Sequence, residues 1–158
     1  MYDIENYYNA STIEEAVRLL KEHPDTRVIS GGSDVLIKIR EGKMAGTSLV
    51  SIRDIKELNG ITKKENGDIY IGAGTTFSHI TNDPVIQENI PVLGEAVDQV
   101  GGPQIRNIGT IGGNICNGCS QRRQRAYGIS SECLLRIEDG TRKNRSGPWI
   151  LPGSGVPC

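Results

Sequence analysis

Two glycine-rich segments about eighty residues apart constrain this chain more than any other feature. The first reads Val28-Ile29-Ser30-Gly31-Gly32-Ser33-Asp34, and the second reads Gly109-Thr110-Ile111-Gly112-Gly113-Asn114. Glycine tolerates positive φ and carries no Cβ, so successive backbone amides in such a segment can converge on an anion. Each segment is therefore typical of a place where the backbone approaches a phosphate, and the two together indicate a dinucleotide.

The first segment has the order of a strand, a tight turn and the start of a helix. An apolar run at residues 27–29 precedes Gly31-Gly32, and a second apolar run follows at residues 35–39. The positive end of the helix would add to the attraction for an anion. Ser33 or Asp34 is a natural N-cap, and we expect Asp34 to cap the helix or contact a ribose, because a carboxylate repels a diphosphate. An ordinary strand-to-helix turn is the alternative interpretation.

The second segment places a hydroxyl, two flexible residues and an amide in one short predicted loop, all of them donors for phosphate oxygens. Neither segment has the G-x-G-x-x-G pattern of nicotinamide-binding Rossmann domains. The one G-x-G in the chain, Gly72-Ala73-Gly74, lacks the third glycine and the acidic residue expected downstream. A nicotinamide Rossmann domain is therefore a poor interpretation.

Six motifs follow one another in a characteristic order and spacing between residue 1 and about residue 118. They are Met1-Tyr2-Asp3, the predicted helix at residues 11–20, Ser30-Gly31-Gly32-Ser33-Asp34, Ile71-Gly72-Ala73-Gly74-Thr75-Thr76, Gly102-Pro103-Gln104-Ile105-Arg106-Asn107 and Thr110-Ile111-Gly112-Gly113-Asn114-Ile115. In these motifs the chain resembles a known family, the FAD-binding medium subunits of bacterial molybdenum hydroxylases, and among them the xanthine dehydrogenase type.

This resemblance implies an α+β fold, the FAD-binding domain shared by vanillyl-alcohol oxidase relatives and the CO dehydrogenase flavoprotein, incomplete here at its C-terminal end. The irregular alternation of predicted strands and helices also favours α+β. By resemblance the cofactor is FAD, and two stretches wrap its diphosphate. The residues concerned are Arg27, Val28, Ile29, Ser30, Gly31, Gly32, Ser33, Asp34, Gly109, Thr110, Ile111, Gly112, Gly113 and Asn114.

The resemblance also implies a place in a three-part oxidoreductase. In the family's scheme a molybdopterin subunit hydroxylates a purine or similar heterocycle, and electrons cross an iron–sulfur subunit to FAD and then reach NAD. A flavin subunit needs no catalytic acid or base of its own for this task, and we predict no catalytic residue. The alternative is a truncated, non-enzymatic remnant that only docks to partner subunits or has no function. We expect this chain alone to bind FAD weakly or not at all.

Composition sets the remaining expectations. The 158 residues (17.1 kDa) suit one domain, and a net charge of −1 gives no reason to expect nucleic acid or an anionic membrane as a partner. The sequence has no apolar run long enough to span a bilayer and no signal peptide pattern, so we expect a cytoplasmic protein. The four cysteines are then expected to be reduced.

The sequence changes character after Gly118, where Cys119-Ser120-Gln121-Arg122-Arg123-Gln124-Arg125 follows. Family members instead continue with segments of the kind A-S-A-D-S-A-P and F-Y-L-G-P. Codons can be chosen for residues 119–129 and 150–155 that encode both segments in one shifted reading frame. We therefore predict residues 1–118 as the N-terminal portion of the FAD-binding domain, and residues 119–158 as an atypical, out-of-frame and poorly ordered tail. A genuine divergent tail is the alternative.

Other reactive side chains carry no site in this interpretation. The pair Cys116-x-x-Cys119 has no partner cysteines at the spacing of a compact zinc ribbon, so we predict no metal site. His23 and His79 are expected to be surface or capping residues. For Arg106 three roles stay open: a phosphate contact, a subunit interface or a structural salt bridge.

Overall fold

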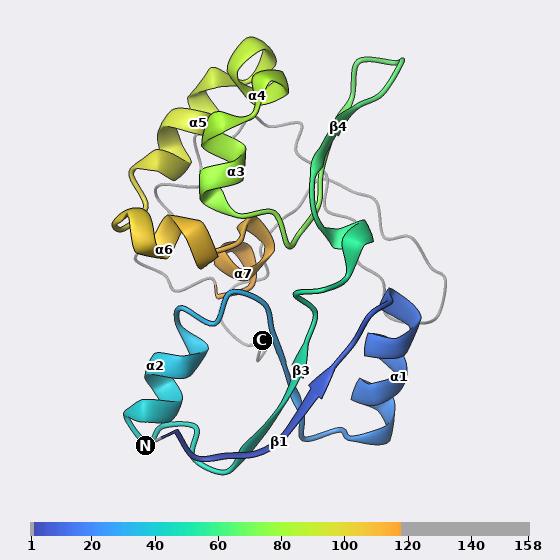
Figure 1. Ribbon diagram of the computed structural model, residues 1–158, viewed down its shortest axis with the longest axis vertical. Helices are drawn as coiled ribbons and strands as arrows, with labels where there is room; N and C mark the ends of the chain where they lie inside the picture. Colours follow the sequence, from blue (N-terminus) through green and yellow to red (C-terminus); the bar gives the residue numbers. More distant parts are fainter. Residues whose placement is uncertain (1, 118–158) are drawn as a thin grey trace, which may run out of the picture.

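The structure, a computed structural model, describes residues 2–117 of the chain. These residues form two lobes, one around a parallel sheet and one built from a hairpin and short helices (Figure 1). The expected α+β class is confirmed. The tail predicted at residues 119–158 lies outside the described residues. No helix within residues 2–117 is long and apolar enough to cross a membrane.

The first lobe is a βαβαβ unit. Its elements are β1 (Ile4–Asn9), α1 (Ile13–Glu22), β2 (Arg27–Ile29), α2 (Val35–Arg40) and β3 (Thr47–Ser51). The strands lie in the order β1-β3-β2, and both pairings are parallel. Because parallel strands point the same way, their carboxyl ends meet at one edge of the sheet, where ligands bind in open α/β sheets. The glycine-rich turn after β2 lies at this edge.

The central strand β3 is covered on both faces. Leu49 and Val50 are fully buried, and as consecutive residues of a strand they point to opposite faces. Leu49 packs with Ile29 and Ile39 on the α2 side, whereas Val50 packs with Ala16 of α1. Figure 1 shows the two helices on either side of the strands. A strand buried on both faces explains the uninterrupted apolar pair in the sequence.

The N-cap of helix α1 lies one residue later than the sequence predicts. Thr12 is the N-cap, and its Oγ1 accepts a hydrogen bond from the Glu15 amide at 3.2 Å. The Glu15 carboxylate in turn accepts from the Ser11 amide at 2.8 Å. The sequence pattern Ser11-x-x-Glu14 predicts a capping box with Ser11 as the N-cap, and this prediction is wrong by one residue. The cause is the preceding residue, Ala10, whose amide still donates to the Ser51 carbonyl of the sheet (3.0 Å) and delays the helix.

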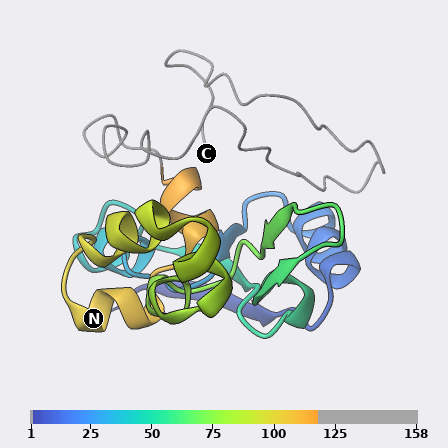
Figure 2. The ribbon, with the colours of Figure 1, turned by 90° about the horizontal axis from the view of Figure 1, so that it is seen from above.

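The second lobe begins with a 3₁₀ turn (Lys56–Leu58) and an antiparallel hairpin of β4 (Ile61–Lys63) and β5 (Ile69–Ile71). The sequence predicts a hairpin around Asn66-Gly67, between runs at residues 61–64 and 69–71, and the structure confirms it. Gly67 has the positive φ of 89° that this turn requires. Five short helices follow: α3 (Phe77–Asn82), α4 (Pro84–Asn89), α5 (Pro91–Asp98), α6 (Pro103–Ile108) and α7 (Ile111–Cys116). In Figure 2 the hairpin lies on the α1 side and helices α3 to α6 on the α2 side.

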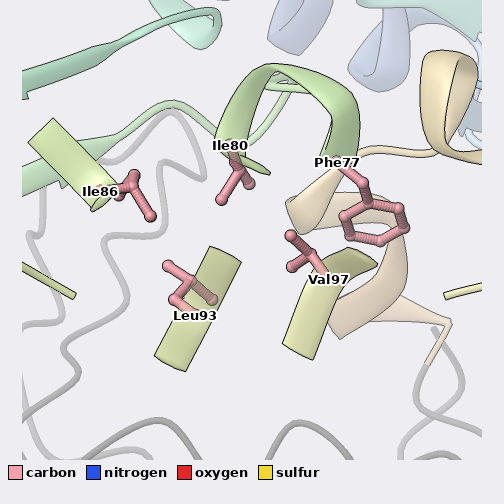
Figure 3. Packing of buried hydrophobic residues seen from close by; sticks show 5 residues of the cluster. All are labelled: Phe77, Ile80, Ile86, Leu93 and Val97. Atoms are coloured by element: carbon pink, nitrogen blue, oxygen red, sulfur yellow. The ribbon is translucent and has the colours of Figure 1, made fainter. Parts of the chain in front are cut away.

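The sequence predicts Thr76 as the N-cap of a helix at residues 77–80, and a further helix from Pro91 through Val100 that ends at Gly101-Gly102. Thr76 caps α3, because its Oγ1 accepts from the His79 amide at 3.3 Å. Helices α4, α5 and α6 each start with proline, which has no N–H to leave unsatisfied there. The helix predicted from Pro91 to Val100 ends at Asp98, and the chain turns at Gly101 with φ 58°. The hydrophobic core of the second lobe consists of Phe77, Ile80, Ile86, Leu93 and Val97 (Figure 3).

Gly94→Ala is expected to raise the free energy of unfolding by about 0.5–1 kcal/mol, because alanine favours a helix over glycine by roughly that amount. Gly94 lies inside α5, and a Cβ there would meet nothing nearer than Ile86 Cγ2 at 3.7 Å. Urea denaturation followed by circular dichroism measures the change. Gly60→Ala is the control, since φ 106° makes alanine unfavourable there although the space around it is open. A destabilised Gly94→Ala protein would show that α5 is packed more tightly than described.

Candidate functional site

The two glycine-rich segments lie against each other where the lobes meet. A Cβ on Gly31 would lie 1.7 Å from the Ile108 carbonyl oxygen and 3.3 Å from the Gly109 nitrogen. The turn between β2 and α2 therefore touches the junction of α6 and α7 backbone to backbone. Figure 1 shows this turn directly beneath α7. The structure thus brings together the two segments that the sequence analysis singled out.

The turn of the first segment keeps its backbone donors available. Arg27, Val28 and Ile29 form the edge strand β2, and residues 30–34 form the turn, with Gly32 at φ 76°. Within residues 2–117, no group accepts a hydrogen bond from the amides of the four residues that open this turn, Ser30, Gly31, Gly32 and Ser33. These four residues are half-buried at the carboxyl edge of the sheet. The turn therefore has several N–H groups without an acceptor in residues 2–117, which is what an anion-binding turn would require.

Asp34 does not cap α2 as expected. It holds the N-cap position, but its side chain accepts no hydrogen bond from the helix, and its φ of −102° and ψ of −41° are already helical. The helical bonding begins earlier, because the Leu36 amide donates to the Gly32 carbonyl at 3.0 Å. The Asp34 carboxylate instead accepts a hydrogen bond from the side-chain amide of Asn117, just beyond α7.

The second segment is a helix start and not the donor loop that we expected. Thr110 is the N-cap of α7, which includes residues 111–116. The first four amides of this helix all donate to protein acceptors: Ile111 to the Thr75 carbonyl (3.0 Å), Gly112 to the Ala73 carbonyl (2.8 Å), Gly113 to Thr110 Oγ1 (3.2 Å) and Asn114 to the Thr110 carbonyl (3.0 Å). The expectation that these amides serve as phosphate donors is therefore corrected.

The glycines of the second segment allow close packing. A Cβ on Gly112 would lie 2.7 Å from both the Cβ and the carbonyl oxygen of Ala73. A Cβ on Gly109 would lie 3.1 Å from the Phe77 ring. A side chain at either position would clash with its neighbour, Ala73 before α3 or Phe77 at the start of α3, and would force the start of α7 away from that part of the second lobe.

Residues 72–76 connect the parts of the site, although their sequence predicts no function for them. Thr75 is 1% exposed; its Oγ1 accepts from the Gly60 amide (2.9 Å) and donates to the Gly60 carbonyl (3.1 Å). Cβ atoms on Gly72 and Gly74 would lie 2.4 and 3.0 Å from the Leu58 carbonyl oxygen. The segment is thus held between the 3₁₀ turn and the start of α7. The sequence signal that could have identified this segment is the pair of glycines, Gly72 and Gly74, followed by two threonines.

The remaining candidate side chains have structural partners. Arg106 pairs with Asp98 at 3.2 Å and donates to the Gly101 carbonyl at 2.8 Å, which favours the salt-bridge alternative. His79 is half-exposed beside Asp83 (3.6 Å), and His23, the C-cap of α1, stacks on a tyrosine. Within the part of the chain that the structure describes, no three His, Cys, Asp or Glu side chains gather closely enough to hold a metal.

Residues 2–142 match a family described as the FAD binding domain in molybdopterin dehydrogenase. The chain is 40% identical over 120 residues to the xanthine dehydrogenase FAD-binding subunit of Escherichia coli O157:H7, and 42% identical over 117 residues to the nicotinate dehydrogenase FAD-subunit of Eubacterium barkeri. These alignments cover 76% and 73% of this chain, but 41% and 39% of the relatives. The chain thus spans about two fifths of the length of these curated relatives.

Solved structures show the same fold. Carbon monoxide dehydrogenase from Hydrogenophaga pseudoflava superposes with a TM-score of 0.80 at 31% identity, over 86% of this chain and 47% of that chain. Quinoline 2-oxidoreductase from Pseudomonas putida 86 gives a TM-score of 0.67 at 28% identity, over 70% of this chain and 39% of that chain. The expected fold of the CO dehydrogenase flavoprotein type is confirmed.

Proposed function

The chain belongs to the family of FAD-binding domains in molybdopterin dehydrogenases, and from this premise we propose that it acts as the FAD-binding subunit of a xanthine dehydrogenase-like molybdenum hydroxylase. Its partners would be the iron–sulfur and molybdopterin subunits of one cytoplasmic complex, and the oxidised substrate a purine or similar heterocycle. The bound flavin would supply the redox chemistry, taking electrons from the iron–sulfur clusters and passing a hydride to NAD.

One observation carries the proposal: at the carboxyl edge of a parallel sheet, the turn between β2 and α2 has N–H groups that find no acceptor in the described part of the chain. Backbone donors in a turn with a left-handed glycine bind phosphate oxygens. Helix α2 has only six residues, so its dipole adds little and the turn's own amides matter most. The four amides of residues 30–33 are the donors that we assign to the FAD diphosphate.

The flanking residues have different tasks in this proposal. Residues 27–29 and Asp34 border the cofactor on either side of the turn. Residues 109–114 lie against the turn and would contact the cofactor with side chains and Cα atoms, since the amides of 111–114 already have partners. Gly113, exposed and without a side chain, leaves room for a ligand on that face of α7. No residue here moves a proton; the chain binds and orients.

A ligand series tests this assignment on the complete 158-residue protein. FAD and ADP both carry a diphosphate, whereas riboflavin carries no phosphate. We expect FAD and ADP to bind at least tenfold more tightly than riboflavin, a difference of about 1.4 kcal/mol. Titration calorimetry at high protein concentration measures affinities even when they are weak. Equal binding of riboflavin and FAD would contradict the diphosphate assignment, and a protein that co-purifies with partner subunits but takes up no flavin would favour a docking remnant.

A further inference from the structure

One side chain ties the end of α7 to the start of α2 across the candidate site. Asn117, the C-cap of α7, donates from Nδ2 to the Asp34 carboxylate, which lies 83 positions earlier in the chain. Its Oδ1 accepts from Lys38 Nζ at 3.2 Å. Asp34 and Lys38 are one helical turn apart, so they face the same way and one amide reaches both. In Figure 1 the two helices lie on either side of the glycine-rich turn.

The chemistry of the bridge requires an amide at this position. A carboxylate only accepts hydrogen bonds and an ammonium group only donates them. The Asn117 side chain presents its NH₂ to the carboxylate of Asp34 and its oxygen to the ammonium of Lys38. The opposite orientation would place like partial charges together at both ends. The neutral amide of Asn117 therefore lies between a carboxylate and an ammonium group, and its two hydrogen bonds connect the second lobe to the first.

This bridge bears on the anion site because Asp34 directly follows the four available amides. A carboxylate beside a diphosphate opposes its binding by like-charge repulsion. Here the carboxylate does not cap α2 but is held by Asn117. The bridge thus fixes the last residue of the turn against the end of α7.

We propose that Asn117 is a positioning residue for the bound diphosphate: by bridging Asp34 and Lys38 it orders the turn at residues 30–34 and draws the carboxylate away from the anion. The inference rests on the proposed function, in which this turn holds the FAD diphosphate. It adds a residue outside the two glycine-rich segments, contributed by the far end of α7.

Three variants test the bridge. Asn117→Ala removes it, Asn117→Asp places a second carboxylate against Asp34, and the double variant Asp34→Asn with Asn117→Asp exchanges the amide and the carboxylate while keeping both hydrogen bonds. Lys38→Met removes one arm only and lies on the exposed face of α2, so it tests the bridge without disturbing packing.

Asn89→Ala is the matched control. Asn89 ends α4 in the second lobe, where its Nδ2 donates to the Val85 carbonyl (2.8 Å) and its Oδ1 accepts from Lys63 Nζ (2.7 Å). It has the same amide bridge to a lysine at a helix end, but it does not belong to the candidate site.

The first measurement is amide hydrogen exchange of Leu36 and Lys38 without ligand, because their amides donate to the carbonyls of Gly32 and Asp34 at 3.0 and 3.1 Å and report on the order of the turn. We expect exchange about tenfold faster in Asn117→Ala, about threefold faster in Lys38→Met, and rates near wild type in the exchanged double variant and in Asn89→Ala. Unchanged rates in Asn117→Ala would overturn the positioning role.

The second measurement is FAD affinity. We expect it to fall about tenfold in Asn117→Ala and further in Asn117→Asp, and to recover in the exchanged double variant. The exchanged variant keeps both hydrogen bonds but carries its carboxylate at residue 117 and not at residue 34, so failure of this rescue would overturn the claim that the bridge positions the turn for the anion. If the wild type binds neither FAD nor ADP, the proposed function fails, and so does the claim that Asn117 affects diphosphate binding. The hydrogen-exchange rates then still decide whether Asn117 orders the turn.

Discussion

Gly31→Ala is expected to lower the free energy of unfolding by about 3 kcal/mol or more and to abolish measurable FAD binding. The new Cβ would lie 1.7 Å from the Ile108 carbonyl oxygen, which belongs to the backbone and cannot rotate away. Overpacking usually costs about 1–3 kcal/mol, and a clash between two backbones belongs at the upper end. Relief requires α7 and the turn to separate, which dismantles the candidate site. Urea denaturation with circular dichroism and FAD titration measure the two effects.

Gly102→Ala is the control for this substitution. Gly102 has φ −93°, which any residue adopts, and a Cβ there would meet only the flexible side chain of Gln104 at 3.2 Å. It lies just before α6, in the same part of the chain as Ile108. Gly102 is the N-cap of α6, where alanine is less favourable than glycine, so we expect a loss of about 1 kcal/mol or less. If Gly31→Ala were as mild as Gly102→Ala, the two glycine-rich segments would not touch as described.

Phe77→Ala is expected to lower the free energy of unfolding by about 3–5 kcal/mol, the usual range for deleting a buried aromatic ring. Phe77 is 3% exposed and lies at one end of the helical core in Figure 3. Its ring also fills the space beside Gly109, and its amide donates to the Gly109 carbonyl at 3.0 Å. Removing the ring therefore loosens both the core and the junction of α6 with α7.

Val92→Ala is the comparison for Phe77→Ala. Val92 is 51% exposed on α5, so its truncation should change stability by less than about 0.5 kcal/mol. Both variants are compared by urea denaturation under the same conditions. A loss of under 1 kcal/mol for Phe77→Ala would mean that the described core does not hold the second lobe together.

Features set by local chemistry could be predicted from the sequence. Asn66-Gly67 between two apolar runs defines a hairpin because the turn itself needs positive φ. Thr76 caps α3 through a hydroxyl that reaches only the next turn of backbone. The strand, turn and helix around Gly31-Gly32 likewise follow from neighbouring residues. In each of these features, the residues that determine the structure lie within a few positions of one another in the sequence.

Features set by distant neighbours could not be predicted. A glycine shows that no Cβ is present, but the sequence does not show what occupies the space. Gly112 suits a phosphate loop and a close helix contact equally well in sequence, and only the position of Ala73 decides for the contact. The α1 capping box occurs twice, one residue apart, and the bond from Ala10 to the sheet selects the second. The same holds for Asn117, whose partners lie about eighty residues earlier.

The central claim is that the amides of residues 30–33 hold the diphosphate of FAD. The most direct test is a residue-resolved ¹⁵N–¹H NMR titration of the full chain with FAD, which detects weak binding amide by amide. We predict that the amides of Ser30, Gly31, Gly32 and Ser33 shift most, and that ADP reproduces these shifts while riboflavin does not. Saturable FAD shifts that leave these four amides unmoved would contradict the account.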